Sequence, residues 1–417
     1  MKNKIVNIIL SAATVMLLMT SCNKELEQFP DGAVVPATGP TLNQVMQGNA
    51  DDSLYYKMIT RIGLNSVLAD TTKFHTLFVS NNNGLKPLLS GIAAQAGITL
   101  PVNAPDAFFS AFISQMPASV IGGLVSYNTV PQKLMAAQIG SSFPNFIYPT
   151  ILDPSNGDSL PPFNQPIIRM SVYPSTANGA WLNNVPITGA DQLARNGVIH
   201  HVATLAIPGQ RFLWDRISTD AELTYLKAAI ERADSGVVAG SRLQDYLSSF
   251  GPDFTVFAPV DTAFQSLLKG LILQGLVAQG LPVVIALPIA TQLASTPSVF
   301  TNPSLASALS PTNVKGIVVY HVLGKRAFTN NFPTTESAIP TLLNSGIPSH
   351  PGLKLKSTFT APNPFASAVT VKDVYNNSPA ANVILNATPL TPDPIGKCDQ
   401  NFVNGVLHKI DKVLLPQ

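Results

Sequence analysis

Charged residues are scarce in this chain of 417 residues. Lys, Arg, Asp and Glu make up 12% of it, which is about half of their share in an ordinary soluble domain. The formal net charge is +2, so no basic face is available to neutralise a phosphate backbone. With 46% hydrophobic residues and 35 prolines, the composition excludes a disordered, coiled-coil or nucleic-acid-binding chain. The length allows two or three domains with their own cores.

Cysteine and the common catalytic motifs are also missing. The two cysteines are too few for a disulfide framework and lack zinc-site spacing. No GxSxG, HExxH, P-loop, GxGxxG or EF-hand pattern occurs. The adjacent His200 and His201 would face opposite sides of a strand, so they do not form a metal-ligand pair. We therefore expect no enzyme, no cofactor and no metal. Cys398 is expected to be a buried thiol or, alternatively, a cross-link between chains.

The N-terminus has the pattern of an export signal. Two lysines are followed by an apolar run over residues 5–19 and by small residues before Cys22. This sequence resembles the bacterial lipoprotein signal, which implies removal of residues 1–21, acylation of Cys22 with palmitate or a similar chain, and a tether over residues 22–39. An ordinary secretory signal or a membrane helix are the alternatives, although the run is shorter than the ~20 residues that span a bilayer.

The residues after Cys22 bear on where such an anchor would lie. Asn23 stands where an Asp would resemble an inner-membrane retention signal. Lys24, Glu25 and Glu27 are similar to the charged export signals of Bacteroidetes lipoproteins. The sequence therefore predicts a lipid-anchored protein of the cell outer membrane, exposed at the cell surface, with the bilayer as one partner.

The second half of the chain repeats the first. Residues 196–200 (NGVIH) match residues 404–408 (NGVLH), and residues 77–79 match residues 256–258. The offset between matching segments grows almost steadily along the chain, so the segments keep their order while the second copy has longer loops. Two copies at this period indicate tandem domains. We place them at residues 40–208 and 209–417.

Periodicity gives a coarse secondary structure for the second copy. Residues 219–222 have the form of a capping box, and apolar residues follow at helical spacing. Residues 255–258 form a short β-rich run, after which Asp261 is placed to cap a helix. Residues 314–323 and 406–415 are rich in Val and Leu and are predicted to be strands. The prediction is an α+β domain.

One apolar stretch permits several interpretations. Residues 270–300 contain no charged side chain, and residues 271–294 are long enough to cross a bilayer. Glutamines and the prolines Pro282 and Pro288 oppose a spanning helix. We expect a helix and loop packed within the domain. A membrane-spanning segment and an insertion that touches a membrane or a partner are the alternatives.

Three segments carry a resemblance to a known family. They are residues 254–264 (FTVFAPVDTAF), residues 320–323 (YHVL) and residues 404–416 (NGVLHKIDKVLLP). In order and spacing they resemble the hallmark segments of the fasciclin (FAS1) domain. The first copy is similar but diverged, because Asn128 stands for His321 and Ser80 for Pro259. The chain resembles a tandem FAS1 lipoprotein.

The resemblance implies a fold and a set of motif residues. The expected fold is a β-sandwich or wedge flanked by helices in each copy. In some animal members the Tyr-His segment contacts a receptor, which implies Tyr320 and His321 as candidate ligand contacts. A structural role, with buried rings and hydrogen-bonded tips, is the alternative. The remaining motif residues are expected to be helix caps and turn or packing residues: Asp261, Asn82, Asn404, Gly405, His408, Asn196, Gly197 and His200.

Family resemblance and composition together predict a binding protein. The expected function is non-catalytic adhesion to a protein or glycan of another cell or matrix, through the longer loops of the second copy. The alternative is an accessory lipoprotein that presents glycans or docks a transporter in polysaccharide uptake. It would need a shallow aromatic platform, for which Trp181, Trp214 and surface tyrosines are the candidates. A passive spacer that self-associates is a third interpretation.

Overall fold

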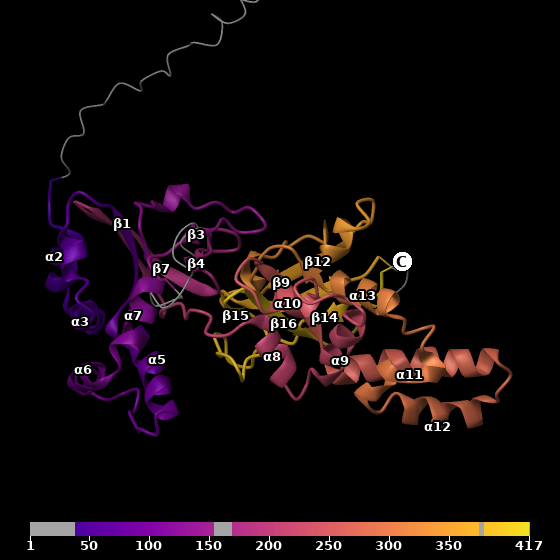
Figure 1. Ribbon diagram of the computed structural model, residues 1–417. Helices are drawn as coiled ribbons and strands as arrows, with labels where there is room; N and C mark the ends of the chain where they lie inside the picture. The colour runs from indigo at the N-terminus through magenta and orange to yellow at the C-terminus, as the bar shows by residue number, and fades with distance from the viewer. Residues whose placement is uncertain (1–37, 154–168, 375–378, 417) are drawn as a thin grey trace, which may run out of the picture. The chain divides into compact units, whose positions relative to one another are not determined.

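The computed structural model describes residues 38–153, 169–374 and 379–416 (Figure 1). The predicted signal peptide, Cys22 and nearly all of the predicted tether therefore lie outside the described residues. Residues Pro40–Gln417 form one unit. Its content is mixed, with 38% of residues in helices and 19% in strands, which agrees with the α+β composition predicted from the sequence.

The first half begins with helices and ends with strands. It also contains short 3₁₀ turns at Ala50–Asp52 and Ala136–Gln138. The elements are α2 (Leu42–Gly48), α3 (Ser53–Arg61), α4 (Asn65–Ala69), β1 (His75–Ser80), α5 (Asn82–Gln95), α6 (Asp106–Gln115), α7 (Ala118–Tyr127), β2 (Thr129–Val130), β3 (Tyr148–Pro149), β4 (Ser171–Val172), β5 (Pro174–Ser175), β6 (Trp181–Leu182), β7 (Val185–Ala194) and β8 (Gly197–Val202).

The second half also begins with helices and ends with strands. Its 3₁₀ turns lie at Pro297–Thr301, Pro303–Leu305, Thr329–Asn331 and Leu342–Ser345. The elements are α8 (Leu213–Thr219), α9 (Thr224–Ala233), α10 (Leu243–Leu247), β9 (Phe254–Pro259), α11 (Asp261–Ala278), α12 (Val283–Leu293), α13 (Pro311–Tyr320), β10 (Val322–Leu323), β11 (Ser337–Ile339), β12 (Leu353–Phe359), β13 (Ala366–Lys372), β14 (Ala381–Asn382), β15 (Gln400–Phe402) and β16 (Gly405–Ile410).

The same strand pairing recurs in the two halves. β1 pairs in parallel with β8, and β9 pairs in parallel with β16. A short antiparallel strand flanks each pair, so the order β2-β1-β8-β7 in the first half matches the order β10-β9-β16-β15 in the second, and the first sheet continues through β6 to β5. The second half also contains a separate antiparallel sheet in the order β11-β12-β13-β14. The sequence repeat thus corresponds to a repeated central pairing.

Each central strand serves two cores because its side chains alternate. In β9, Val256 and Ala258 pack with α9, α11 and α13, while Phe257 joins a second core with Leu355 and Val371 of the other sheet. β1 does the same in the first half, where Leu77 and Val79 face the helices and Phe78 the opposite core. The motif strands therefore lie at the centre of each half.

One predicted strand is a helix. Residues 314–323 were expected to be extended because of their Val content, but the chain forms α13 there and only Val322 and Leu323 are in a strand. Ser310 caps α13 by accepting from the backbone of Asn313, and Pro311 takes the first helical position. The cap and the i, i+4 burial of Val314 and Val318 outweigh the β-branched residues. The other predicted strand ends at Ile410, earlier than the expected residue 415.

A buried polar cluster joins the two halves. Nε of Arg326 lies 2.7 Å from Oδ1 of Asp253, and its guanidinium lies over the ring of Tyr173, 5.0 Å from the centroid. The hydroxyl of Tyr173 donates to the same Asp253 carboxylate at 2.8 Å. Asn401 accepts from Arg326 and donates to the hydroxyl of Tyr127. Because Tyr127 and Tyr173 come from the first half, these contacts hold the halves together.

Candidate binding surfaces

The Asn-Gly motif residues are structural. Oδ1 of Asn196 accepts from the backbone of Leu42 at the start of α2, and Oδ1 of Asn404 accepts from Leu213 at the start of α8. A Cβ on Gly197 would lie 2.0 Å from the carbonyl oxygen of His75, so no larger residue fits beside β1. Gly405 has the equivalent place beside β9, with a φ of 159°. These residues connect the last strand to the first helix of each half.

The motif histidines are buried in matching environments. Nδ1 of His200 accepts a hydrogen bond from the backbone N–H of Asp191, and Nε2 donates one to the carbonyl oxygen of Leu134. His408 makes the same two bonds, with the backbone N–H of Asp399 and the carbonyl oxygen of Ala327. Both rings stack on the phenylalanine of the neighbouring strand. Burial lowers the pKa of both histidines, so both are neutral near pH 7. Neither imidazole reaches the surface, which is consistent with the predicted packing role.

Asp261 and Asn82 are caps, but not of the helices that follow them. Asp261 is the first residue of α11, and its Oδ1 accepts from the backbone of Tyr225 at the start of α9. Asn82 likewise accepts from Leu54 at the start of α3. The local interpretation is wrong because each side chain turns away from its own helix toward an earlier one. Both therefore tie two helices together, a long-range contact that spacing alone does not reveal.

Tyr320 and His321 lie inside the protein. Their exposed fractions are 0% and 2%, so neither can contact a partner in this conformation. The hydroxyl of Tyr320 donates to Gly352 at 2.8 Å. His321 donates from Nδ1 to Ile317 and accepts at Nε2 from Leu414. The structural alternative therefore fits this pair, at the C-terminus of α13 rather than within a strand.

A charge pair recurs between the last strand and the first helices. In the first half, Nε2 of His201 lies 3.1 Å from Oδ2 of Asp52. In the second half, Lys409 occupies the matching strand position and contacts the carboxylates of Asp220 and Glu222. The sequence analysis missed both pairs, although the offset of His201 and Lys409 equals that of the neighbouring histidines. The pair is titratable near neutral pH in the first half only.

The His201 pair predicts a small pH dependence of stability. Its hydrogen bond to Asp52 raises the pKa of His201 above 6.5, so the folded state holds the proton more tightly than the unfolded state. The stabilisation is fully present below about pH 6.5 and is lost as pH rises through the folded pKa. Because a quarter of the side chain is exposed, we expect a loss below about 1 kcal/mol.

The measurement compares urea unfolding of the wild type and of His201→Gln between pH 6 and pH 9. The wild type is expected to lose its advantage over the variant as pH rises. An advantage that is constant or grows with pH would contradict the assigned pair.

Other residues considered from the sequence lie in the interior. Cys398 is buried, and burial raises its pKa well above the ordinary value, so the thiol is unreactive. Trp181 is also buried and donates to the backbone of Asn178, so it does not form a surface platform. Within the described ranges, no group of three or more His, Cys, Asp and Glu side chains is placed to hold a metal ion.

The apolar stretch forms an exposed helical hairpin. α11 and α12 run side by side and are joined at residues 279–282 (Figure 1). Ala286 and Ala290 are the buried residues of α12. Ile272 of α11 and the segment after α12, with Ala294, Val299 and Phe300, are also buried in the core of this half. The expectation of a helix and loop packed within the domain is thus right for these parts and wrong for the outer surface of the hairpin. The rest of α12 exposes large apolar side chains, which with two of α11 define the hairpin face: Leu271, Val277, Val283, Val284, Ile285, Leu287 and Ile289.

The hairpin does not match a membrane-spanning segment. Among the residues searched, no single helix is long and apolar enough to cross a bilayer, and α12 passes only as a shorter apolar helix. One bent pair, α6 with α7, meets the criteria of length and composition at an angle of 111°. The spanning interpretation of residues 271–294 therefore has no single continuous helix to support it.

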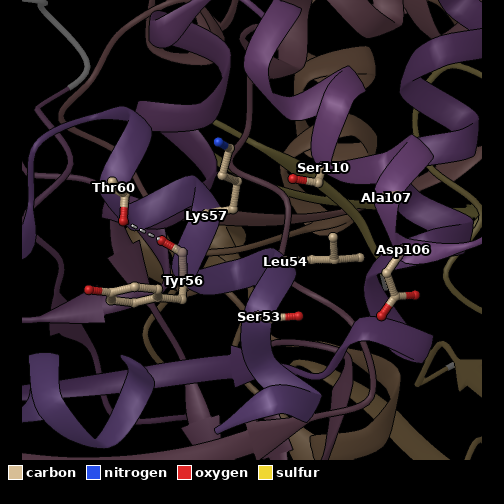
Figure 2. A pocket seen from close by; sticks show the side chains of 8 residues that line it. All are labelled: Ser53, Leu54, Tyr56, Lys57, Thr60, Asp106, Ala107 and Ser110. Atoms are coloured by element: carbon tan, nitrogen blue, oxygen red, sulfur yellow. Dashed lines mark hydrogen bonds between the residues drawn. The ribbon is translucent and has the colours of Figure 1, made fainter. Parts of the chain in front are cut away.

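A shallow groove lies between α3 and α6 (Figure 2). Its volume is about 400 Å³. Asp106 is its anionic group, because Lys86, 2.6 Å away, holds the pKa of that carboxyl below its ordinary value. Hydroxyl and amine groups provide most of the remaining polar lining. The polar residues of the groove are Ser53, Tyr56, Lys57, Thr60, Asp106 and Ser110.

Comparisons with known proteins found similarity among solved structures only. No family model and no curated protein sequence matches the chain. Among solved structures, the chain is similar to a FAS1 domain pair from the insect cell adhesion molecule Fasciclin I, with 13% sequence identity and a TM-score of 0.31. The match covers 87% of this chain and 96% of the other. At this identity and TM-score the similarity does not assign the chain to a family.

Proposed function

We propose that the protein is a non-catalytic adhesion lipoprotein, built from two FAS1-like repeats and anchored to the outer membrane through Cys22. In this proposal the hairpin face binds an apolar surface of a protein on another cell or in the matrix. The supporting observation is the exposure of the face: Val284 is 78% and Val283 56% exposed, and residues 270–300 carry no charge. Contiguous apolar patches on soluble proteins commonly mark interaction sites.

A lipid anchor would compensate for the weak binding expected of the hairpin face. An apolar face without charges gives neither long-range steering nor strong ion pairs, so each contact with a partner is individually weak. Lipid attachment would confine many copies to one surface, where weak contacts combine through a high effective concentration. The buried junction around Arg326 holds the two repeats together, which would let them act as one unit between the anchor and the partner.

The proposal is tested by placing a charge on the hairpin face. The protein without residues 1–22 is screened against matrix proteins and a glycan array, and the strongest binder is measured with Val284→Glu and Leu287→Glu. A buried carboxylate without a partner is costly, so each variant should weaken protein binding at least about 10-fold. The matched control is Val238→Glu, which changes a residue that is 72% exposed outside the hairpin and should bind normally.

The alternative function is glycan presentation or docking in a polysaccharide-uptake system. The groove between α3 and α6 favours it, because hydroxyls and a carboxylate are the groups that hydrogen-bond sugars. The buried Trp181 removes one of the two tryptophans that this function was expected to use. Selective glycan binding that is lost in Asp106→Asn and kept in Val284→Glu would support the alternative and contradict the adhesion proposal.

A further inference from the structure

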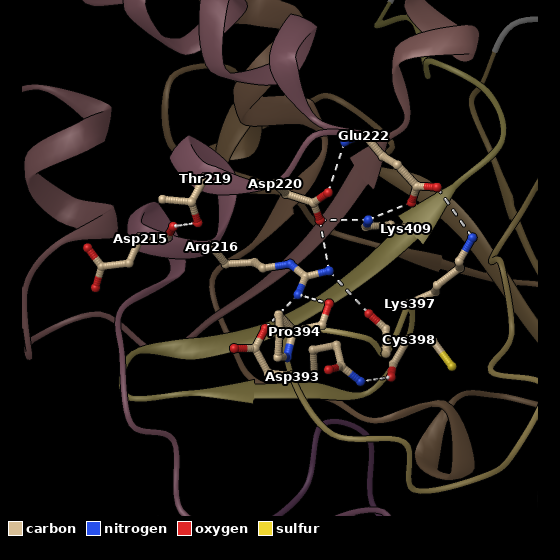
Figure 3. A network of polar contacts seen from close by, with 12 residues as sticks. Asp215, Arg216, Thr219, Asp220, Glu222, Asp393, Pro394, Lys397, Cys398 and Lys409 are labelled. Carbon is tan, nitrogen blue, oxygen red and sulfur yellow. Dashed lines mark hydrogen bonds and ion pairs between the residues drawn. The ribbon is translucent and has the colours of Figure 1, made fainter. Parts of the chain in front are cut away.

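A buried lysine in the second half has two carboxylates as neighbours (Figure 3). Lys409 lies in β16 and its side chain is 3% exposed. Its Nζ is 2.6 Å from Oδ2 of Asp220 and 2.7 Å from Oε2 of Glu222. Asp220 follows α8 and Glu222 precedes α9, so the contact connects the last strand of this half with its first helices. The ammonium of Lys409 and the carboxyl of Asp220 are therefore close enough to react with one another as well as to form an ion pair.

The carboxyl of Asp220 is held in a fixed orientation. The backbone N–H of Glu222 donates to its Oδ1 at 2.9 Å, and Nη2 of Arg216 contacts its Oδ2 at 2.7 Å. The side chain of Asp220 is 9% exposed, and Oδ2 makes only ionic contacts, without regular hydrogen-bond geometry. Oδ1 thus has a donor that can stabilise negative charge, while Oδ2 faces the amine and the guanidinium.

We propose that Lys409 and Asp220 condense to an intramolecular isopeptide bond, with Glu222 as the proton acceptor. The ammonium first passes one proton to Oδ2 of Asp220, which gives a neutral amine and a neutral acid. Nζ then attacks Cγ of Asp220, Glu222 takes a proton from Nζ, and the negative charge on Oδ1 faces the N–H of Glu222. Glu222 returns its proton to the Oδ2 hydroxyl, the Cγ–Oδ2 bond breaks, and one water leaves.

Burial favours the neutral product. The condensation removes one positive and one negative charge, and a charge out of water is costly even when it is paired. Arg216 keeps other partners when Asp220 becomes an amide, because Nη1 lies 2.7 Å from Asp393 and Nη2 reaches the carbonyl of Gly396 at 3.3 Å. Burial raises the pKa of Asp220, but Lys409 and the N–H of Glu222 outweigh it and lower the pKa. The bond therefore starts from an ion pair and forms after folding.

The link would close nearly the whole second half into a covalent ring. Such a link restricts the unfolded chain as a disulfide does, here without a second cysteine. The first half provides an internal contrast, because His201 and Asp52 stand in the corresponding place and an imidazole cannot form a stable amide. The inference is independent of the partner proposed above, since it concerns this chain alone.

Intact-mass measurement of the denatured protein tests the bond. The wild type is expected to be lighter than its sequence by one water, and protease digestion should give one peptide that joins Lys409 to Asp220. Lys409→Arg and Glu222→Gln should both have their full sequence mass. Lys397→Arg is the matched control, because Lys397 also pairs with Glu222, at 3.5 Å, but is exposed. It should lose water as the wild type does.

Two results would overturn the proposal. The first is a wild-type protein at full mass, with Lys409 and Asp220 in separate peptides after prolonged incubation of the folded protein. The second is a loss of water that persists in Lys409→Arg, because a cyclic imide at Asp220 and not a link to lysine would then explain the mass. Circular dichroism of each variant checks that the fold is retained, so that an absent bond is not mistaken for misfolding.

Discussion

An Arg326→Met variant should have a free energy of unfolding about 3 kcal/mol below that of the wild type. Methionine retains the aliphatic part of the side chain but removes the guanidinium, which is 4% exposed at Arg326. Asp253 then keeps a charge without its cation, and Asn401 and Val403 lose the donors that satisfy their oxygens. Removing the buried partner of such a pair costs more than the pair contributes, because Asp253, whose side chain is 26% exposed, stays partly desolvated without its cation and two other oxygens lose their donors.

Denaturant unfolding of the wild type and of the variant measures this difference. Arg195→Met is the matched control, since Arg195 is exposed and its replacement should change stability by less than about 0.5 kcal/mol. A double-mutant cycle with Tyr173→Phe, which keeps the ring and removes the hydroxyl, measures the coupling through the shared Asp253. Equal stability of Arg326→Met and Arg195→Met would show that the junction does not connect the halves energetically.

The sequence predicts those elements of the fold that are determined by neighbouring residues. Residues 255–258 alternate in a short β-rich run, and β9 forms there. The Asn-Gly pairs stand at the start of strands in both halves, and their repetition predicts a packing role for His408, whose ring is buried and bonded to Ala327. In each case a few neighbouring residues determine the backbone, so a pattern of residues is sufficient.

The sequence is least informative where distant segments decide the outcome. Val314 and its neighbours have strand propensity, yet the cap at Ser310 and burial against α9 make them helical. Asp261 looks like the cap of its own helix and instead caps α9. The junction of Arg326 with Tyr173 joins residues from different repeats, and no spacing rule connects them. Tertiary context outweighs local propensity in all three cases.

The hairpin of α11 and α12 shows a different limit of prediction from sequence. Its length and lack of charge are visible in residues 270–300, but a buried helix and an exposed one can share that composition. α12 is apolar on nearly every side while it buries only Ala286 and Ala290, so no amphipathic pattern distinguishes an inner from an outer face. Exposure of this surface is therefore learned from the structure alone.

The free energy of unfolding should fall by about 3 kcal/mol between about pH 6.5 and about pH 4 because of the buried His321. Burial lowers the pKa of His321 from 6.5 to about 4. Between these values the unfolded chain binds a proton that the folded chain excludes, so stability is present above pH 6.5 and decreases as the pH falls. His200 and His408 shift in the same direction and add to the total acid sensitivity.

The first half of the chain indicates which substitution removes the titration of His321 and keeps its hydrogen bonds. Asn128 occupies the place of His321: its Nδ2 donates to Leu124 and Ala206, and its Oδ1 accepts from Ala206. His321→Asn should therefore keep the hydrogen bonds without a titrating group. The smaller amide leaves a void, so we expect a constant loss of about 1–2 kcal/mol but a flatter dependence on pH. Urea unfolding from pH 7.5 to pH 4 in both proteins measures the two slopes, and parallel slopes would show that His321 does not cause the acid sensitivity.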